Sequence, residues 1–241
     1  MTHRPEILCL TFVLLLLLPT AAVAQGESGN PENWCRNGAF PQDGPGLKLA
    51  RVRGPRNRKV HFLNDTGDCP QTSNPKCVEK SYLMAGDEVI VSRKYGNWMC
   101  SWYEPQRGSE TVGWLPLESL LVTEPDANPP PEKWIGLWKN GDNSLSIKQD
   151  GQTGLLHISG EAYWPGLRTN YPSVHTGEVQ ARAKPQGNTL ALEEESCKVS
   201  LWLVGGLLVA SDNLQCGGAN VSFSGVYRKK TERRPPKRLS L

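Results

Sequence analysis

Cysteines are the residues of this 241-residue chain whose chemistry is easiest to infer from type and spacing. There are seven, and Cys9 lies inside an N-terminal apolar run, so six remain in the rest of the chain. No two are spaced as Cys-x-x-Cys, and the three histidines after the apolar run do not stand at ligand spacing. The sequence therefore predicts no metal site and no cofactor, and the even number of cysteines favours disulfides. These six are Cys35, Cys69, Cys77, Cys100, Cys197 and Cys216.

Catalytic motifs are the next class of reactive residues, and the sequence contains none that we recognise. It has no His-Glu-x-x-His, no Gly-x-Ser-x-Gly and no phosphate-binding glycine loop. Cys/His peptidases associated with cell walls place the cysteine before the histidine, whereas His157 and His175 precede Cys197. Two carboxylates across a cleft would suffice for a glycosidase, which keeps a cell-wall hydrolase as an alternative. We expect a protein that is not an enzyme.

The N-terminal segment is typical of a cleavable export signal. Residues 7–18 are almost wholly apolar, Arg4 precedes them, and the small-residue pattern Ala22-Val23-Ala24 follows. The apolar run is shorter than the roughly 20 residues that span a bilayer, so a membrane anchor is the less favoured alternative. We predict a signal peptide over residues 1–24 and a periplasmic or secreted protein. Disulfides persist in such oxidising compartments.

Charge is concentrated at the C-terminus. The whole chain has a formal net charge of +3, whereas residues 228–241 alone carry seven Lys or Arg and one Glu. With Pro235 and Pro236 inside it, the segment 229–241 is predicted to be a disordered basic tail. Such a tail either stays in solvent or touches an anionic membrane or glycan. Export and a slightly acidic body argue against nucleic acid as a partner.

Two modules and a linker are predicted around these features. Residues 123–132 include three consecutive prolines, which favour a stiff spacer, and they separate residues 34–122 from residues 133–228. Apolar and polar residues alternate in both halves, and Gly and Asn turns separate the runs. We therefore expect an all-β protein of two small disulfide-stapled β-barrel-type modules, an SH3-like barrel followed by an antiparallel barrel or sandwich. Predicted strands are Lys48–Val52, Cys77–Leu83, Glu88–Arg93, Trp98–Tyr103 and Thr111–Leu115, then Ser144–Lys148, Leu155–Gly160, Gly177–Ala181, Lys198–Leu203, Leu207–Ala210 and Val221–Tyr227.

Residues of the first module resemble a known family. Ala85–Val91, Asn97–Cys100 and Val112–Leu120 follow the order Gly-Asp-x-Val-x-Val, Gly-x-Trp and Gly-Trp-Leu of bacterial SH3-like (SH3b) domains. The resemblance covers about residues 47–122, whereas Arg53-Gly54-Pro55 fits the pattern only loosely. It implies a ligand such as a peptidoglycan stem peptide, a bridging peptide or a proline-rich segment, or else a role as a spacer beside an enzyme.

Aromatic residues are the candidate ligand contacts of this module, because flat rings give contact area at low entropic cost. Alternation places Trp98 and Trp102 on one face, and Trp114 is assigned to the core. Residues 65–77 form an enlarged loop, and our first choice among the three possible pairings is Cys69–Cys77 with Cys35–Cys100. The candidates are Tyr82, Tyr95, Trp98, Trp102 and Tyr103.

The second module has a weaker resemblance to calycin barrels, the lipocalins and avidins. Gly136-Leu137-Trp138 and Arg228 match their first-strand Gly-x-Trp and the arginine that packs over that tryptophan to close the barrel base. Cys197 and Cys216 bracket two predicted strands and would staple this hairpin. Polar residues of the following loop are candidate ligand contacts or caps of their own turns. The candidates in this module are Trp164, Asp212, Asn213 and Asn220.

These features lead us to expect an exported, non-enzymatic binding protein of the bacterial cell envelope. Its SH3b-like module would bind peptidoglycan or a peptide. The main alternative is a periplasmic inhibitor or immunity protein against a secreted cell-wall hydrolase, with residues 164–176 and 212–220 as loops that enter its cleft. A cell-wall hydrolase is the third possibility.

Overall fold

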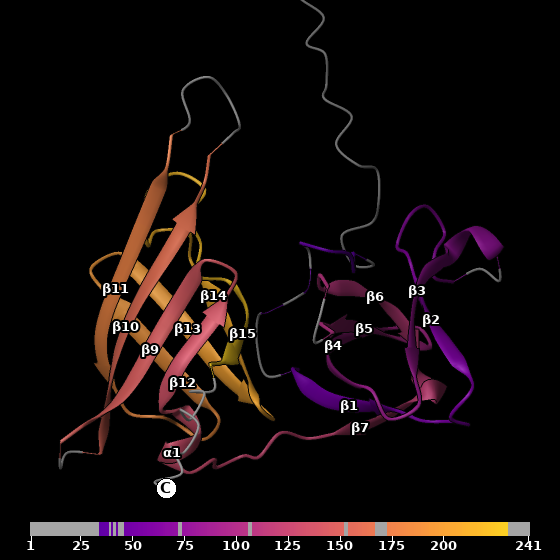
Figure 1. Ribbon diagram of the computed structural model, residues 1–241, viewed down its shortest axis with the longest axis horizontal. Helices are drawn as coiled ribbons and strands as arrows, with labels where there is room; N and C mark the ends of the chain where they lie inside the picture. The colour runs from indigo at the N-terminus through magenta and orange to yellow at the C-terminus, as the bar shows by residue number, and fades with distance from the viewer. Residues whose placement is uncertain are drawn as a thin grey trace, which may run out of the picture.

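The computed structural model describes residues 34–38, 40, 42, 46–71, 74–105, 108–151, 154–166 and 173–230. The predicted signal peptide and residues 231–241 of the predicted tail lie outside these residues. The protein is all-β, with two sheets joined by a segment that contains the short helix α1 (Pro131–Trp134), as Figure 1 shows. No helix in the described ranges has the length and apolarity needed to cross a membrane.

The first module contains a seven-stranded antiparallel sheet with the order β3-β2-β6-β5-β4-β1-β7. The 3-10 turns Pro75–Cys77 and Leu117–Ser119 precede β3 and β7. Gly113 in β6 packs closely on β2, because an added Cβ would lie 3.1 Å from the carbonyl oxygen of Leu63. The strands are β1 (Lys48–Val52), β2 (Lys59–Leu63), β3 (Val78–Met84), β4 (Glu88–Tyr95), β5 (Trp98–Tyr103), β6 (Thr111–Pro116) and β7 (Leu120–Thr123).

The second module contains an eight-stranded antiparallel sheet with the order β11-β10-β9-β8-β15-β14-β13-β12. Its first strand, β8, pairs with its last, β15, so the sheet curls into a nearly closed barrel around its own apolar core. The seam lies between β11 and β12, where the backbone N–H of Gln180 donates to the Glu194 carboxylate at 2.6 Å. The strands are β8 (Gly136–Asn140), β9 (Asn143–Asp150), β10 (Leu155–Trp164), β11 (His175–Ala183), β12 (Thr189–Glu194), β13 (Cys197–Val204), β14 (Leu207–Asp212) and β15 (Gly225–Lys229).

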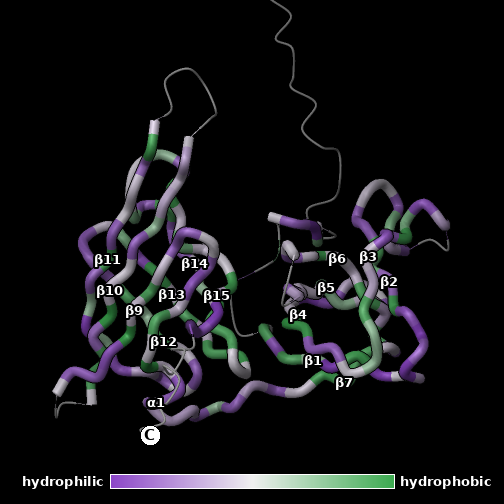
Figure 2. The backbone as a smooth tube through the Cα atoms, viewed as in Figure 1, coloured by the Kyte–Doolittle hydropathy of each residue, from purple (hydrophilic) through white to green (hydrophobic). Residues whose placement is uncertain are grey.

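Alternating polarity explains why most predicted strands are present. Figure 2 shows polar and apolar residues alternating along the strands of the second sheet, as expected where one face is buried and the other solvated. Ten of the eleven predicted strands overlap observed strands closely. The prediction of a strand from Val221 is wrong, because Val221 and Phe223 fill the barrel core from a loop and β15 begins at Gly225. The predicted set omitted β2, β7, β8 and β12.

Three disulfides staple the modules, with the pairing that was our first choice. Cys35 is joined to Cys100 and Cys69 to Cys77 in the first module, and Cys197 is joined to Cys216 in the second. The Cys35–Cys100 bond ties the segment before β1 to β5. The Cys197–Cys216 bond ties the start of β13 to the loop after β14. Intramolecular disulfides are compatible with an oxidising compartment.

A third apolar cluster, here called the intermodule cluster, joins the two modules. In β5, Cys100 and Trp102 turn away from the core of the first sheet and toward this cluster, whereas Met99 points into that core. The second module contributes side chains from the outer face of its barrel, which is otherwise mainly polar. The two modules are therefore packed against each other by apolar side chains. The buried members are Cys35, Phe40, Leu47, Ile90, Cys100, Trp102, Val112 and Trp114 from the first module, and Val204, Val209 and Val226 from the second.

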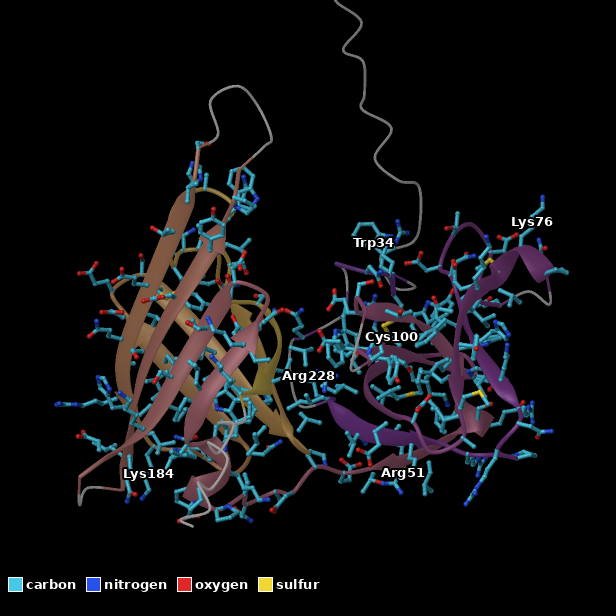
Figure 3. The ribbon with its side chains drawn as sticks, in the orientation of Figure 1. Trp34, Arg51, Lys76, Cys100, Lys184 and Arg228 are labelled. Atoms are coloured by element: carbon cyan, nitrogen blue, oxygen red, sulfur yellow. A yellow bond between two sulfur atoms is a disulfide. The ribbon has the colours of Figure 1, made fainter. Side chains whose placement is uncertain are left out.

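Arg228 belongs to this contact between the modules, which corrects the role implied by the calycin resemblance. Its guanidinium donates to the carboxylate and the backbone carbonyl of Glu104, and it lies 5.8 Å from the Trp102 ring centroid. Figure 3 shows Arg228 between the two sheets. The neighbouring Lys229 instead covers Trp138, with Nζ 5.1 Å from the ring centroid. Successive residues of a strand point to opposite faces, so a shift of one position exchanges the two roles.

Lys229 also extends the strand into the segment predicted to be a tail. Its Nζ donates to the backbone carbonyls of Glu132 and Lys133 at the base of the barrel. Burial lowers the pKa of Lys229, and the neighbouring positive charge of Lys133 lowers it further. Trp138 itself donates from Nε1 to the carbonyl of Trp134 at 2.8 Å, so α1 and the start of β8 close this end.

Stability at alkaline pH is expected to depend on Tyr227, which is fully buried and donates to the carbonyl of Phe223 at 2.8 Å. Burial raises the pKa of Tyr227 well above its ordinary value of 10.0. The unfolded chain therefore releases this proton at lower pH than the native protein, so the native state loses stability as pH rises above about 10. Denaturant titrations between pH 8 and pH 11 measure how the free energy of unfolding changes with pH. Burial also raises the pKa of Tyr103, which contributes in the same direction.

The Tyr227→Phe variant isolates this effect. It is expected to lose about 1 kcal/mol at pH 8, the hydrogen bond to Phe223, and to show a shallower decline above pH 10. Tyr82→Phe, a change at an exposed tyrosine, is the matched control. If the stability of Tyr227→Phe fell above pH 10 as steeply as that of the unmodified protein, the pH dependence could not be assigned to Tyr227.

Candidate functional site

The most complete candidate site is a pocket on the first module between the β4–β5 turn and the turn before β7. Its volume is about 680 Å³, and Trp98, Pro116 and Leu117 form its apolar part. The backbone holds these residues together, because Trp98 pairs with Pro116 across β5 and β6 and the Leu117 N–H donates to the Asn97 carbonyl at 2.8 Å. Trp98 is half-buried, so part of its ring faces the pocket. We call this the Trp98 pocket.

Polar groups line the other side of the Trp98 pocket. Arg53 follows β1, and its Nε donates to the backbone carbonyl of Glu118. The remaining N–H groups of the Arg53 guanidinium are available to a ligand, since a guanidinium has five donors in a planar fork. Asn97 adds an amide and Glu118 a carboxylate.

The β1–β2 connection carries several positive charges, of which Arg53 lines the Trp98 pocket. Arg53, Arg56 and Arg58 lie in the connection between the two strands, and Lys59 begins β2; all four are exposed. A flat aromatic surface beside the Arg53 guanidinium suits an extended ligand that carries carboxylates. The arrangement provides binding groups, and it contains no nucleophile paired with a base.

The other aromatic candidates of the first module have different environments. Trp102 is buried in the intermodule cluster, where its Nε1 donates to Glu110, so it has no surface to offer a ligand in this arrangement. Tyr95 packs beside Trp114 with ring centroids 5.7 Å apart, and Trp114 is fully buried, as expected of a core residue, within the intermodule cluster. Tyr103 packs on the core of the first sheet. Tyr82 is 44% exposed, away from the Trp98 pocket, beneath the Lys59 ammonium and beside His61.

The polar candidates of the second module mostly hold their own loop. The Asp212 carboxylate accepts from the Ser222 and Ser224 hydroxyls and from the Phe223 N–H, each at 2.8 Å. The Asn213 side chain bonds Lys198 N–H and Ser196 carbonyl. These contacts match the alternative of turn capping that the sequence left open.

Asn220 and Trp164 complete the candidates of this module. Asn220 is exposed and adopts a φ of 64°. Trp164 packs on the barrel core and lies 5.2 Å from the His175 ring. The two loops predicted to enter a hydrolase cleft lie side by side in their described parts, since the Gly218 N–H donates to the Thr176 carbonyl at 3.2 Å. Leu214 in the second loop is 66% exposed.

Comparison with known proteins gives no family for this chain. No family model, no curated protein and no solved structure matches the chain. Within the described ranges, no group of three or more His, Cys, Asp or Glu side chains is placed to hold a metal ion. The function is therefore inferred from the residues of the site.

Sequence analysis identified Trp98 and did not identify the rest of the pocket. Asn97, Pro116, Leu117 and Glu118 were named only as parts of the SH3b-like motifs, and Arg53 only as a loose match to that pattern. The signal that could have found Arg53 is the basic run from Arg53 to Lys59, which is unusual in a slightly acidic body.

Proposed function

We propose that this protein is an exported, non-enzymatic binding protein of the bacterial cell envelope, and that the Trp98 pocket binds a carboxylate-bearing peptide of peptidoglycan. The observation that carries the proposal is the position of Arg53 beside the half-buried Trp98 in one open pocket. Peptide carboxylates supply the charge that Arg53 attracts, and an extended backbone fits against the aromatic ring. The resemblance of residues 47–122 to SH3b domains supports the same class of ligand.

The intermodule cluster supports the choice of this pocket over the rest of the aromatic face to which Trp98 belongs. Trp102 and Trp114 on that face are covered by the second module and by the segment that carries Cys35 and Phe40. Trp98 stands at the edge of the covered area and keeps part of its ring exposed. A ligand of this module therefore has a prepared site at Trp98 without any separation of the modules.

Trp98→Ala is expected to weaken binding of the full-length mature protein to purified peptidoglycan sacculi by tenfold or more. The reason is that a central aromatic contact contributes about 2 kcal/mol to binding. Arg53→Gln is expected to weaken binding by about tenfold and to reduce its dependence on salt. Sedimentation of the protein with sacculi over a range of concentrations gives the apparent Kd.

Two matched variants control for general effects. Tyr82→Ala removes an exposed aromatic outside the pocket, and Arg51→Gln removes an exposed arginine two residues from Arg53 that forms an ion pair with Glu88. Both are expected to bind as the unmodified protein does. Sacculus binding that is absent, or that survives Trp98→Ala and Arg53→Gln unchanged, would remove the basis of the proposal.

A further inference from the structure

The outer face of β9, β10 and β11 has an unusual order of charges. Figure 1 shows the three strands side by side on the barrel. Side chains alternate, so every second residue points outward, and the register sets which outward residues are neighbours across strands. Three transverse rows result. They are Ser144–Glu161–Glu178, then Ser146–Ser159–Gln180, then Lys148–His157–Arg182.

The three rows are acidic, neutral and basic in turn. Successive outward rows are two residues apart along a strand, or about 6.7 Å, so the acidic and basic rows are about 13 Å apart. The small serines between them leave room above the sheet. Three adjoining hollows follow the rows, with volumes of about 470 Å³ at Glu161 and Glu178, about 290 Å³ over the serines, and about 610 Å³ at His157 and Arg182.

The acidic row is energetically unfavourable as it stands. Glu161 and Glu178 lie directly opposite each other, and like charges in that position destabilise a strand pair. Among the described residues no Lys, Arg or His forms an ion pair with either, although Lys139 stands next to Ser144 at the end of the row. A cation supplied from outside would relieve this repulsion.

Tyr163 stands beyond the acidic row and lines the same hollow as Glu161 and Glu178. Its side chain is 39% exposed, and it pairs with Thr176 across the strands. An aromatic ring next to two carboxylates suits an ammonium group, because the ring face also attracts a cation.

The basic row is set up for an anion. His157 and Arg182 are direct neighbours, with Lys148 on the other side of His157. Arg182 forms an ion pair with Asp150 through Nε at 3.1 Å, which leaves other guanidinium donors for a ligand. Glu193 also lines this hollow, and its carboxylate forms an ion pair with Lys198 Nζ at 2.8 Å.

We propose that this face binds a short zwitterionic peptide of about four residues, lying along β10 with its N-terminal ammonium at Glu161 and Glu178 and its C-terminal carboxylate at His157 and Arg182. An extended chain of four residues spans about 13 Å, the distance between the two rows. The Ser146 and Ser159 hydroxyls and the Gln180 amide between them accept and donate hydrogen bonds, which suits a peptide backbone. Free peptides carry both charges, whereas an amino sugar oligomer supplies only the cation.

The experiment uses the full mature protein and tetra-alanine with free termini, followed by calorimetry or by NMR titration. Blocking the amino terminus by acetylation or the carboxyl terminus by amidation is expected to weaken binding tenfold or more in each case. Free dialanine, which is too short to reach both rows, is expected to bind at least tenfold more weakly than tetra-alanine.

Variants of the charged residues test which row binds which end of the peptide. Glu161→Gln with Glu178→Gln is expected to abolish the preference for a free amino terminus and to keep the preference for a free carboxylate. Arg182→Gln is expected to do the reverse. Glu132→Gln and Arg56→Gln, changes at exposed positions away from this face, are matched controls that keep both preferences.

Four results would overturn the proposal. These are no binding of tetra-alanine at 10 mM, equal binding of the blocked peptides, full binding by the variants, and tighter binding of a glucosamine oligomer than of tetra-alanine. The Trp98→Ala variant is expected to bind tetra-alanine normally, because the Trp98 pocket is on the other module. Failure of one proposal is therefore distinguishable from failure of the other.

Discussion

Replacing both Cys35 and Cys100 by alanine is expected to lower the free energy of unfolding by about 4 kcal/mol, the largest loss from any of the three disulfides. In the chain-entropy model a crosslink restricts the unfolded chain more when it closes a longer loop, and this one joins residues 65 positions apart. Both cysteines are also fully buried in the intermodule cluster, so losing the bond loosens the segment that covers Trp102. Denaturant unfolding at neutral pH measures the loss.

The other two disulfides are the matched controls. Cys197–Cys216 closes a separation of 19 residues and Cys69–Cys77 a separation of 8, which correspond to about 3 and about 2.5 kcal/mol. The three double-alanine variants are expected to lose stability in the order of loop length. A loss from Cys69→Ala with Cys77→Ala as large as that from Cys35→Ala with Cys100→Ala would contradict this account.

Val209→Asp is expected to separate the two modules without unfolding either. Val209 lies on β14, on the outer face of the barrel, and is fully buried in the intermodule cluster. An unpaired carboxylate held there would cost several kcal/mol. Opening the contact hydrates the charge at the cost of the intermodule contacts alone, and each module keeps its own core and disulfides.

Small-angle scattering and NMR relaxation measure this separation. The radius of gyration of the variant is expected to increase, and the two modules are expected to tumble with different correlation times. Leu121→Asp, which places the same charge at a position that is 59% exposed in the first module, is the control and is expected to remain compact. An unchanged radius of gyration in folded Val209→Asp would show that other contacts hold the modules together.

The separation has a consequence for the Trp98 pocket. Trp98 packs partly against the intermodule cluster, and Arg228 of the second module bonds Glu104 after β5. If peptide binding needs only the pocket itself, Val209→Asp keeps sacculus binding while exposing Trp102 to solvent. A shift in tryptophan fluorescence reports that exposure.

The alternation of polar and apolar residues along the chain was enough to predict the fold class and most of the strands. Each strand buries one face, so its residues alternate in a way that can be read within a few positions, and turns at Gly and Asn mark where it ends. The disulfide pairing of the first module was a first choice among three that the sequence left open, and the structure has that pairing. Trp98 and Trp102 were correctly placed on one face by the same alternation.

Only the tertiary structure decided which aromatic residue stays available and what the charges face. The burial of Trp102 depends on Val204, Val209 and Val226, which are over 100 residues away in sequence and leave no local signal. Lys229, and not Arg228, lies over Trp138 because of the strand register. A shift of one residue would exchange the two side chains. The acidic and basic rows exist because β9, β10 and β11 pair in one register, so that Glu161 meets Glu178 and His157 meets Arg182. Alternation is a property of neighbours in the chain, whereas these contacts are properties of neighbours in space.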